Sequence, residues 1–209
     1  MKNKERIFQK TYNDYLELIK DINLDFISPK LGAKHEKNKI KIKLFNNEYT
    51  ISAEKISDSS GQKPSFSICV ILSKYILLCP KTSPNDHDWV SYRNFKNSAP
   101  LIDYFNNEVE EAISSHFSKK TIKLRKASEA LCGFPPSLKA NYDFVVQFDA
   151  LPMIPLILLF NDSDEEFPAT CSILFESQAE RYLDCECLAM LGRQLFSHLK
   201  KELKDNKIN

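Results

Sequence analysis

The sequence predicts an α+β protein in which a mainly antiparallel sheet is flanked by helices and a long helix ends the chain. Three observations lead to this prediction. Residues 142–175 fall into three apolar runs, rich in β-branched and aromatic residues and separated by turn residues, which is typical of successive strands. Residues 5–22 and residues 177–204 instead carry apolar side chains at helical spacing. Consecutive strands between two helical regions indicate an α+β rather than an alternating α/β architecture.

The length and composition are those of an ordinary globular domain. The chain has 209 residues, of which 43% are hydrophobic and 27% are charged. We therefore expect a single domain over 1–209, with a helix and a hairpin in 1–63 and the main core in 64–209. The formal net charge of +1 gives no reason to expect nucleic acid or an anionic membrane as a partner.

The chain carries no sequence signal for export or membrane insertion. Its first ten residues, MKNKERIFQK, lack the apolar core of a signal peptide, and its longest apolar run, MIPLILLF, is too short to span a bilayer. We expect a soluble, cytoplasmic protein. In that compartment the cysteines are reduced thiols. They are Cys69, Cys79, Cys132, Cys171, Cys185 and Cys187.

The first 65 residues predict a helix, a hairpin and a linker. After the helix at 5–22, KIKIKLF (39–45) alternates apolar and lysine residues, NNEY (46–49) is the expected turn, and TISAEKI (50–56) is the partner strand. The lysine face has two interpretations: a phosphate-binding stripe, or an edge strand that its charges protect from unwanted pairing, which is the more usual case. DSSGQKPS (58–65) is the expected linker.

The middle of the chain predicts mostly helix. FSICVILSKYILLC (66–79) is too long and too continuously apolar for an ordinary strand, so we expect a buried helix, followed by a loop at 81–88 and a short strand WVSYRNF (89–95). Two helices follow, at 100–117 and 120–133, and the second ends at Gly133, a residue suited to a left-handed cap.

The last helix has the clearest pattern of the chain. Ser177 and Glu180 match the S-x-x-E capping box at its start. Its apolar stripe is Leu183, Cys187, Leu191, Leu195 and Leu199.

Several cofactor sites have no support in the sequence. The four glycines, Gly32, Gly61, Gly133 and Gly192, form neither G-x-G-x-x-G nor a phosphate loop. No C-x-x-C pair is present for zinc, and no clustered cysteine motif for an iron–sulfur centre. The cofactor is therefore unknown, with a divalent metal as the one possibility that the sequence raises.

That possibility comes from NDSDEEFPA (161–169), which places Asp162, Asp164, Glu165 and Glu166 between two apolar strands. Three interpretations stay open. The acids solvate a turn, they form a surface for a ligand or partner, or Asp162, Asp164 and Glu165 bind a hard cation such as Mg²⁺ or Ca²⁺.

The second candidate segment is WVSYRNF, which contains the only tryptophan. At the spacing of a strand, Trp89, Ser91 and Arg93 share one face, where an aromatic ring and a guanidinium group can hold a planar or anionic ligand. The alternative is that Trp89 packs in the core and Arg93 pairs with the acids of the turn.

Three segments, WVSYRNF, ALPMIPLILLFNDSDEEFPATCSILFE and YLDCECLAMLG, resemble in this order the domain of unknown function 3786 family. The resemblance extends over residues 65–200, and DEEFPA followed by ILF is its most specific part. It implies a relative of uncharacterised proteins of anaerobic bacteria and archaea, some of them described as iron–sulfur proteins. It transfers no catalytic residue, because the activity of the family is not established. The chain departs from the family pattern after WVSYR, where NFKNSA replaces a stretch that contains glycine.

The resemblance adds weight to the residues that match the family pattern. They are Trp89, Ser91, Arg93, Asp164, Glu165, Glu166, Phe167, Pro168 and Glu186.

Our leading hypothesis is a non-catalytic protein of anaerobic metabolism that binds a small molecule or a protein partner. Its ligand-binding residues would be Trp89, Ser91 and Arg93 of the strand together with Asp164, Glu165 and Glu166 of the turn. One alternative is a metal-dependent hydrolase or transferase that uses the DSDEE carboxylates. Another is a structural protein that functions through an oligomer interface. The sequence leaves the oligomeric state, the ligand and the question of catalysis open.

Overall fold

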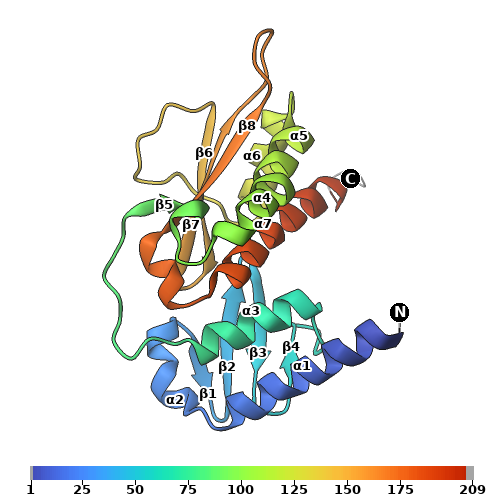
Figure 1. Ribbon diagram of the computed structural model, residues 1–209, viewed down its shortest axis with the longest axis vertical. Helices are drawn as coiled ribbons and strands as arrows, with labels where there is room; N and C mark the ends of the chain where they lie inside the picture. The colour runs from blue at the N-terminus through green and yellow to red at the C-terminus, as the bar shows by residue number, and fades with distance from the viewer. Residues whose placement is uncertain (1, 206–209) are drawn as a thin grey trace.

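The computed structural model describes residues 2–205, with side chains from residue 5 to residue 202. It confirms the α+β class: two four-stranded antiparallel sheets lie one beyond the other along the long axis, and helices cover them (Figure 1). Among the residues described, no helix is both long enough and apolar enough to cross a bilayer.

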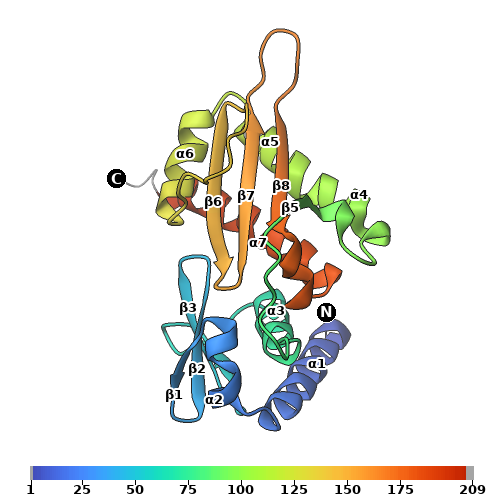
Figure 2. The ribbon, with the colours of Figure 1, turned by 90° about the vertical axis from the view of Figure 1, so that its left-hand side faces the viewer.

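The first sheet is built from the N-terminal part of the chain. Its strands are β1 (Lys34–Glu36), β2 (Lys39–Leu44), β3 (Asn47–Ile51) and β4 (Ile56–Ser57), in the order β1-β2-β3-β4. The apolar residues of β2 and β3 are buried, while the lysines of β2 alternate with them on the other face. Two helices run alongside this sheet, α1 (Lys2–Lys20) and α3 (Phe66–Leu77), and both were expected from the sequence (Figures 1 and 2).

Two details of the predicted hairpin are wrong. The chain reverses at Phe45 and Asn46, because Leu44 pairs directly with Asn47 and Phe45 has a left-handed φ of 51°. Most of NNEY therefore belongs to β3 rather than to the turn. In addition, β2 is not an edge strand, since β1 pairs with it on one side and β3 on the other. The edge-protection explanation for its lysines does not hold.

Between β1 and the first helix lie a short helix α2 (Leu24–Ile27) and a 3-10 turn (Pro29–Leu31). The linker 58–65 and the loop 81–88 are free of helix and strand, as expected, and α3 ends at Leu77, two residues before its predicted end at Cys79.

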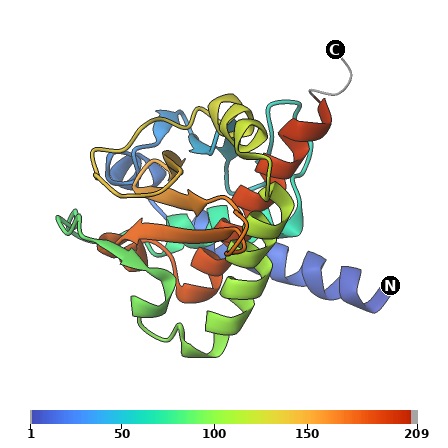
Figure 3. The ribbon, with the colours of Figure 1, turned by 90° about the horizontal axis from the view of Figure 1, so that it is seen from above.

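The second sheet contains the three strands predicted from residues 142–175. They are β6 (Phe144–Leu151), β7 (Ile154–Asn161) and β8 (Thr170–Glu176), and the short β5 (Trp89–Ser91) completes the order β5-β8-β7-β6. The helices α4 (Ile102–Phe105), α5 (Glu111–Phe117) and α7 (Cys185–Asp205) cover one face of this sheet (Figure 3). Along the other face runs the segment that links α6 (Thr121–Ala130) to β6.

The helix expected at 100–117 is present, but it is not regular. A 3-10 turn (Ala99–Leu101) leads into α4, and a π-helical segment (Asn106–Glu110) separates α4 from α5. A π-helical segment changes the direction in which the following side chains point, and such segments occur frequently at functional sites.

The predicted left-handed cap at Gly133 is wrong by one residue. The left-handed φ, 59°, belongs to Cys132, whereas Gly133 lies against the second sheet. A Cβ atom at Gly133 would come within 2.7 Å of Val146 and 2.8 Å of Phe148. The glycine is needed for close packing rather than for its backbone conformation.

The predicted capping box of the last helix is also wrong. Residues Ser177–Arg181 form a 3-10 helix, and α7 begins only at Cys185. Asp184 caps it, because the Asp184 carboxylate accepts a hydrogen bond of 2.9 Å from the N–H of Cys187. The five residues of the predicted apolar stripe are all buried, which confirms that part of the prediction.

Tyr75 of α3 links the two sheets. Its hydroxyl group donates to the carbonyl oxygen of Leu31 at 2.9 Å and accepts from the N–H of Met153 at 3.1 Å. The N–H of Phe45 donates to the carbonyl oxygen of Ala150 at 2.8 Å nearby. Apart from Ile157 and Leu159 of β7, the buried apolar residues of both sheets belong to one continuous cluster.

Candidate functional site

A cleft of about 350 Å³ lies where β5 ends, between β8 and the π-helical segment. We call it the Arg93 cleft. Its polar lining is Ser91, Arg93, Asn106, Glu110, Tyr142 and Ser172, and its apolar lining includes Ile102, Phe105, Leu159 and Leu174. An apolar cleft with a few convergent polar groups is the usual form of a small-molecule site.

The local sequence explains how Arg93 reaches this cleft. β5 pairs with β8 from Trp89 to Ser91, and at Tyr92 the chain turns into a 3-10 helix (Tyr92–Asn94). Tyr92 is buried, stacks on Phe105 with ring centroids 4.2 Å apart, and donates a hydrogen bond of 2.9 Å to the carbonyl oxygen of Cys185. With Tyr92 anchored inside, the neighbouring Arg93 is directed outward.

This turn changes the predicted arrangement of WVSYR. Ser91 and Arg93 both line the cleft, but the strand ends at Ser91, so Arg93 does not continue the strand face that Trp89 and Ser91 share. Trp89 is half-buried and does not line the cleft. The aromatic residues of the cleft lining are instead Tyr92, Phe105 and Tyr142.

Besides Arg93, the cleft contains a partly buried carboxyl group. Glu110 closes the π-helical segment, and its side chain accepts a hydrogen bond of 2.9 Å from the N–H of Ile173. That N–H lies just beyond the end of the β5–β8 pairing, which stops at Leu174. Glu110 thus satisfies a backbone donor that the short β5 leaves open.

The charge state of Glu110 depends on its surroundings. Burial raises the pKa of Glu110, although the hydrogen bond from Ile173 and the positive charge of Arg93 act in the opposite direction. A carboxyl group with a raised pKa in a cleft is a frequent mark of a functional site. Glu110 was not predictable from the sequence, because EVEE (108–111) has the pattern of an exposed helical surface and nothing in it signals a π-helical segment.

Arg93 is exposed, and among the side chains described no carboxylate lies within 4 Å of its guanidinium group. Its charge influences Glu110 from a greater distance. The guanidinium group is therefore free to bind an anionic group of a ligand in the bidentate manner that suits a carboxylate.

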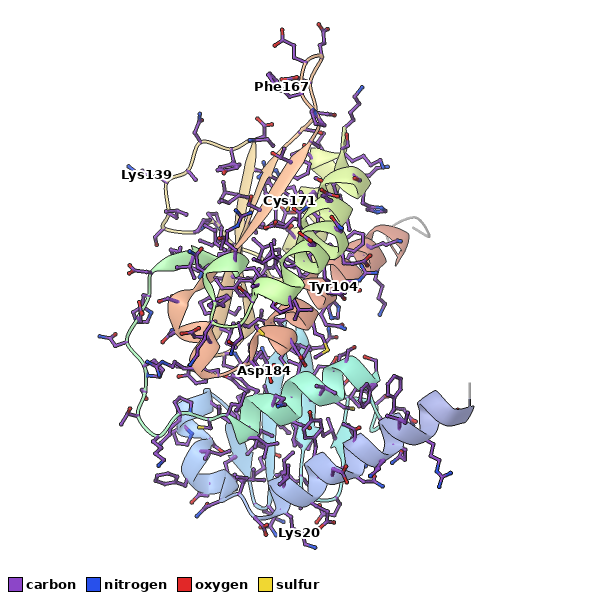
Figure 4. The ribbon with its side chains drawn as sticks, in the orientation of Figure 1. Lys20, Tyr104, Lys139, Phe167, Cys171 and Asp184 are labelled. Carbon is purple, nitrogen blue, oxygen red and sulfur yellow. The ribbon has the colours of Figure 1, made fainter. Side chains whose placement is uncertain are left out.

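The acidic turn lies far from this cleft. β7 and β8 extend into a long hairpin loop, and Phe167 marks its tip (Figure 4). Trp89 pairs with Glu176 and Ser91 with Leu174, whereas the loop precedes Thr170 at the other end of β8 (Figure 2). The structure does not bring the WVSYR residues and the DEEFPA residues into one surface.

Two of the acids have structural roles in this loop. The Asp162 carboxylate accepts hydrogen bonds from the N–H of Lys119 and the hydroxyl group of Thr121, and so ties the hairpin to the start of α6. The Asp164 carboxylate accepts from the N–H groups of Glu166 at 2.8 Å and Phe167 at 2.7 Å, which lowers the Asp164 pKa.

The remaining acids, Glu165 and Glu166, are exposed. Within residues 5–202, no three carboxylate, histidine or cysteine side chains are grouped so that they could hold a metal ion. The metal ligands predicted from the sequence, Asp162, Asp164 and Glu165, therefore do not converge.

The comparisons with known proteins identify a family but not an activity. The model of a family described as Domain of unknown function (DUF3786) matches residues 23–198. The match includes the strands of the first sheet, which the resemblance seen in the sequence did not reach. No curated protein and no solved structure matches the chain significantly. The chain belongs to the DUF3786 family, whose function is unknown.

Proposed function

We propose that this protein binds a small organic molecule that carries a carboxylate group, and that the Arg93 cleft is its binding site. One observation carries the proposal: the guanidinium group of Arg93, which has no carboxylate partner among the described side chains, lines a cleft that also holds the partly buried carboxyl group of Glu110.

The two groups select for different parts of a ligand. Arg93 offers a planar pair of donors to a carboxylate, and Ser91 and Asn106 add neutral polar groups beside it. Glu110 accepts a donor such as a hydroxyl or amino group when it is ionised, and donates one itself when it is protonated. The apolar residues beneath them suit a short carbon skeleton.

A thermal-shift screen of small carboxylic, hydroxy and amino acids tests the proposal. A ligand that binds only the folded protein stabilises it by about 2.7 kcal/mol at 100 times its Kd. Divalent metals, corrinoids and nucleotides belong in the same screen, because they represent the alternatives raised by the sequence.

Variants locate the site. We expect Arg93→Ala to abolish the stabilisation by a carboxylate, and Arg93→Lys to weaken it, because lysine retains the charge but loses the bidentate geometry. Arg6→Ala removes an exposed arginine from α1 and is the matched control. Glu165→Gln, in the hairpin loop, should leave the stabilisation unchanged. Stabilisation that survives Arg93→Ala, or that Glu165→Gln removes, would refute the assignment of the cleft.

A further inference from the structure

The lysines of β2 are unexplained by the fold. β2 is paired on both sides, so its charges do not serve to protect a sheet edge. The register places Lys34 of β1 directly opposite Lys41, and Lys43 lies two residues further along on the same face. Like charges directly opposite each other destabilise a sheet, so this arrangement costs stability unless an anion offsets it.

The charge of this group is only partly balanced. Lys41 pairs with Glu36 at 2.8 Å. Among the residues described, neither Lys34 nor Lys43 has a carboxylate within 4 Å of its ammonium group. Two of the three ammonium groups are therefore available to a ligand.

These three lysines line a pocket of about 370 Å³ at the junction of the two sheets. We call it the lysine pocket. Its apolar residues are Phe45, Leu131 and Pro152, which come from the β2–β3 turn, the end of α6 and the β6–β7 turn. It shares no lining residue with the Arg93 cleft.

Two acids also line the lysine pocket, and they restrict what it can accept. Glu48 is opposite Lys43 in the β2–β3 register. Asp149 is exposed, although desolvation by the surrounding protein raises its pKa, and no hydrogen bond to its side chain is found within the described part of the chain. Asp149 is thus a free acceptor for a hydroxyl or amino group of a ligand.

We propose that the lysine pocket binds an organic phosphomonoester, with its phosphate group on Lys34, Lys41 and Lys43 and its apolar part on Phe45, Leu131 and Pro152. Lysine ammonium groups act as compact point charges, and several of them together favour a phosphate dianion over a single carboxylate. No glycine-rich loop is required, because side chains rather than backbone N–H groups supply the charge.

The alkylation rate of Cys132 can report whether the lysine pocket is occupied. It is exposed and lies in the wall of the lysine pocket, whereas Cys185 is half-buried and lies elsewhere. Phenyl phosphate is the probe, at constant ionic strength and pH 7.5. We expect it to slow the alkylation of Cys132 by iodoacetamide about tenfold at saturation, as followed by peptide mass spectrometry, while Cys185 reacts at an unchanged rate. Phenyl sulfate, a monoanion of the same shape, should protect less.

Variants distinguish binding in the lysine pocket from non-specific attraction to surface charge. We expect the double variant Lys34→Gln/Lys43→Gln to bind phenyl phosphate about tenfold more weakly, whereas Lys39→Gln should bind it normally. Lys39 lies on the same strand but outside the lysine pocket. An equal loss in Lys39→Gln, or no protection of Cys132 by phenyl phosphate at about 10 mM, would overturn the proposal. All three substituted lysines are exposed lysines of the sheet, and thermal melts of the variants verify that they are folded.

Discussion

The ammonium group of Lys74 lies 3.1 Å from a carboxylate oxygen of Asp184, and this ion pair joins α3 of the first sheet to the start of α7 on the second. Asp184 lies between the two halves of the molecule (Figure 4). The same carboxylate caps α7 through the N–H of Cys187. One side chain therefore fixes a helix start and holds the two halves of the fold together.

We expect Asp184→Ala to lower the free energy of unfolding by about 1–3 kcal/mol, because it removes the helix cap and leaves Lys74 unpaired. Asp184→Asn should cost less, since asparagine is a good cap but carries no charge. Urea denaturation measures both. Ser177→Ala is the control, because Ser177 belongs to the 3-10 helix and does not cap α7. An equal cost at Ser177 and Asp184 would contradict the assignment of the cap.

Asp162 should make the protein sensitive to acid. Burial disfavours the charged form of Asp162, but hydrogen bonds from Thr121 and from the N–H groups of Lys119 and Ser163 outweigh it and lower the pKa. The stabilisation is therefore present above the unfolded pKa of about 3.9 and is lost as the pH falls through the lower folded pKa.

We expect Asp162→Asn to be less stable than wild type by about 1 kcal/mol at pH 7, a small value because the carboxyl group is mostly solvated. The difference should shrink towards pH 2. Chemical denaturation at a series of pH values measures it, with Glu165→Gln as a control on the same hairpin. A difference that stays constant down to pH 2 would rule out this account.

Glu110 should destabilise the protein as the pH rises, whereas Asp162 destabilises it as the pH falls. Its pKa is raised in the folded state, so its contribution to stability is present below the unfolded pKa of about 4.3 and is lost as the pH rises through the folded pKa. Glu110→Gln keeps an acceptor for the N–H of Ile173 and removes the titration. The variant should match wild type near pH 4 and exceed it by about 1 kcal/mol at pH 7.5. A variant that is less stable than wild type at pH 7.5 would show that the ionised form is favoured in the fold.

Substitutions at two adjacent residues after α6 should change the free energy of unfolding in opposite directions. Cys132→Gly should raise the free energy of unfolding by about 0.5–1 kcal/mol, because glycine adopts the left-handed conformation without strain. Gly133→Ala should lower it by about 1–3 kcal/mol, because the added methyl group meets Val146, Phe148 and the carbonyl oxygen of Ser128. Thermal or urea denaturation distinguishes them, and the reverse order would place the left-handed residue at Gly133.

Two lysines in the β1–β2 pair should also shift the Tm in opposite directions when each is replaced by glutamate. Lys34→Glu should raise the Tm by about 1–2 °C at low salt, because glutamate then faces Lys41. Lys39→Glu should lower it by a similar amount, because Lys39 faces Glu36. Differential scanning calorimetry at low and high salt measures both shifts, and salt should reduce them. Shifts of the same sign would show that the cross-strand pairing does not control them.

Much of the fold follows from local sequence patterns. The strands β6, β7 and β8 were predictable because they are apolar runs, rich in β-branched and aromatic residues, between turn residues, and the apolar stripe of α7 because burial of one helix face imposes a helical period. The missed features depend on distant contacts. β1 is three exposed residues long, so nothing in its own sequence indicates that it covers the edge of β2. Gly133 is explained by Val146 and Phe148, which only the folded chain brings near.

The same distinction applies to the candidate site. Ser91 and Arg93 were identified from an unusual polar motif, and both line the Arg93 cleft. Glu110 was not, since its position depends on the π-helical segment and on the point where β5 ends. The acidic turn was expected beside Arg93, but the length of the β7–β8 hairpin carries it to the far end of β8.

Because of the π-helical segment, the loss of one residue would change the direction of the side chains on this helix. A π-helical turn holds one residue more than the α-helical turn it replaces, so deleting a single residue from Asn106–Glu110 would restore a regular α-helix. One residue corresponds to a rotation of about 100° around the helix axis. Such a deletion would turn either Glu110 away from the cleft or Phe105 away from Tyr92. A homologue one residue shorter here would keep the fold but present a different side chain to the Arg93 cleft.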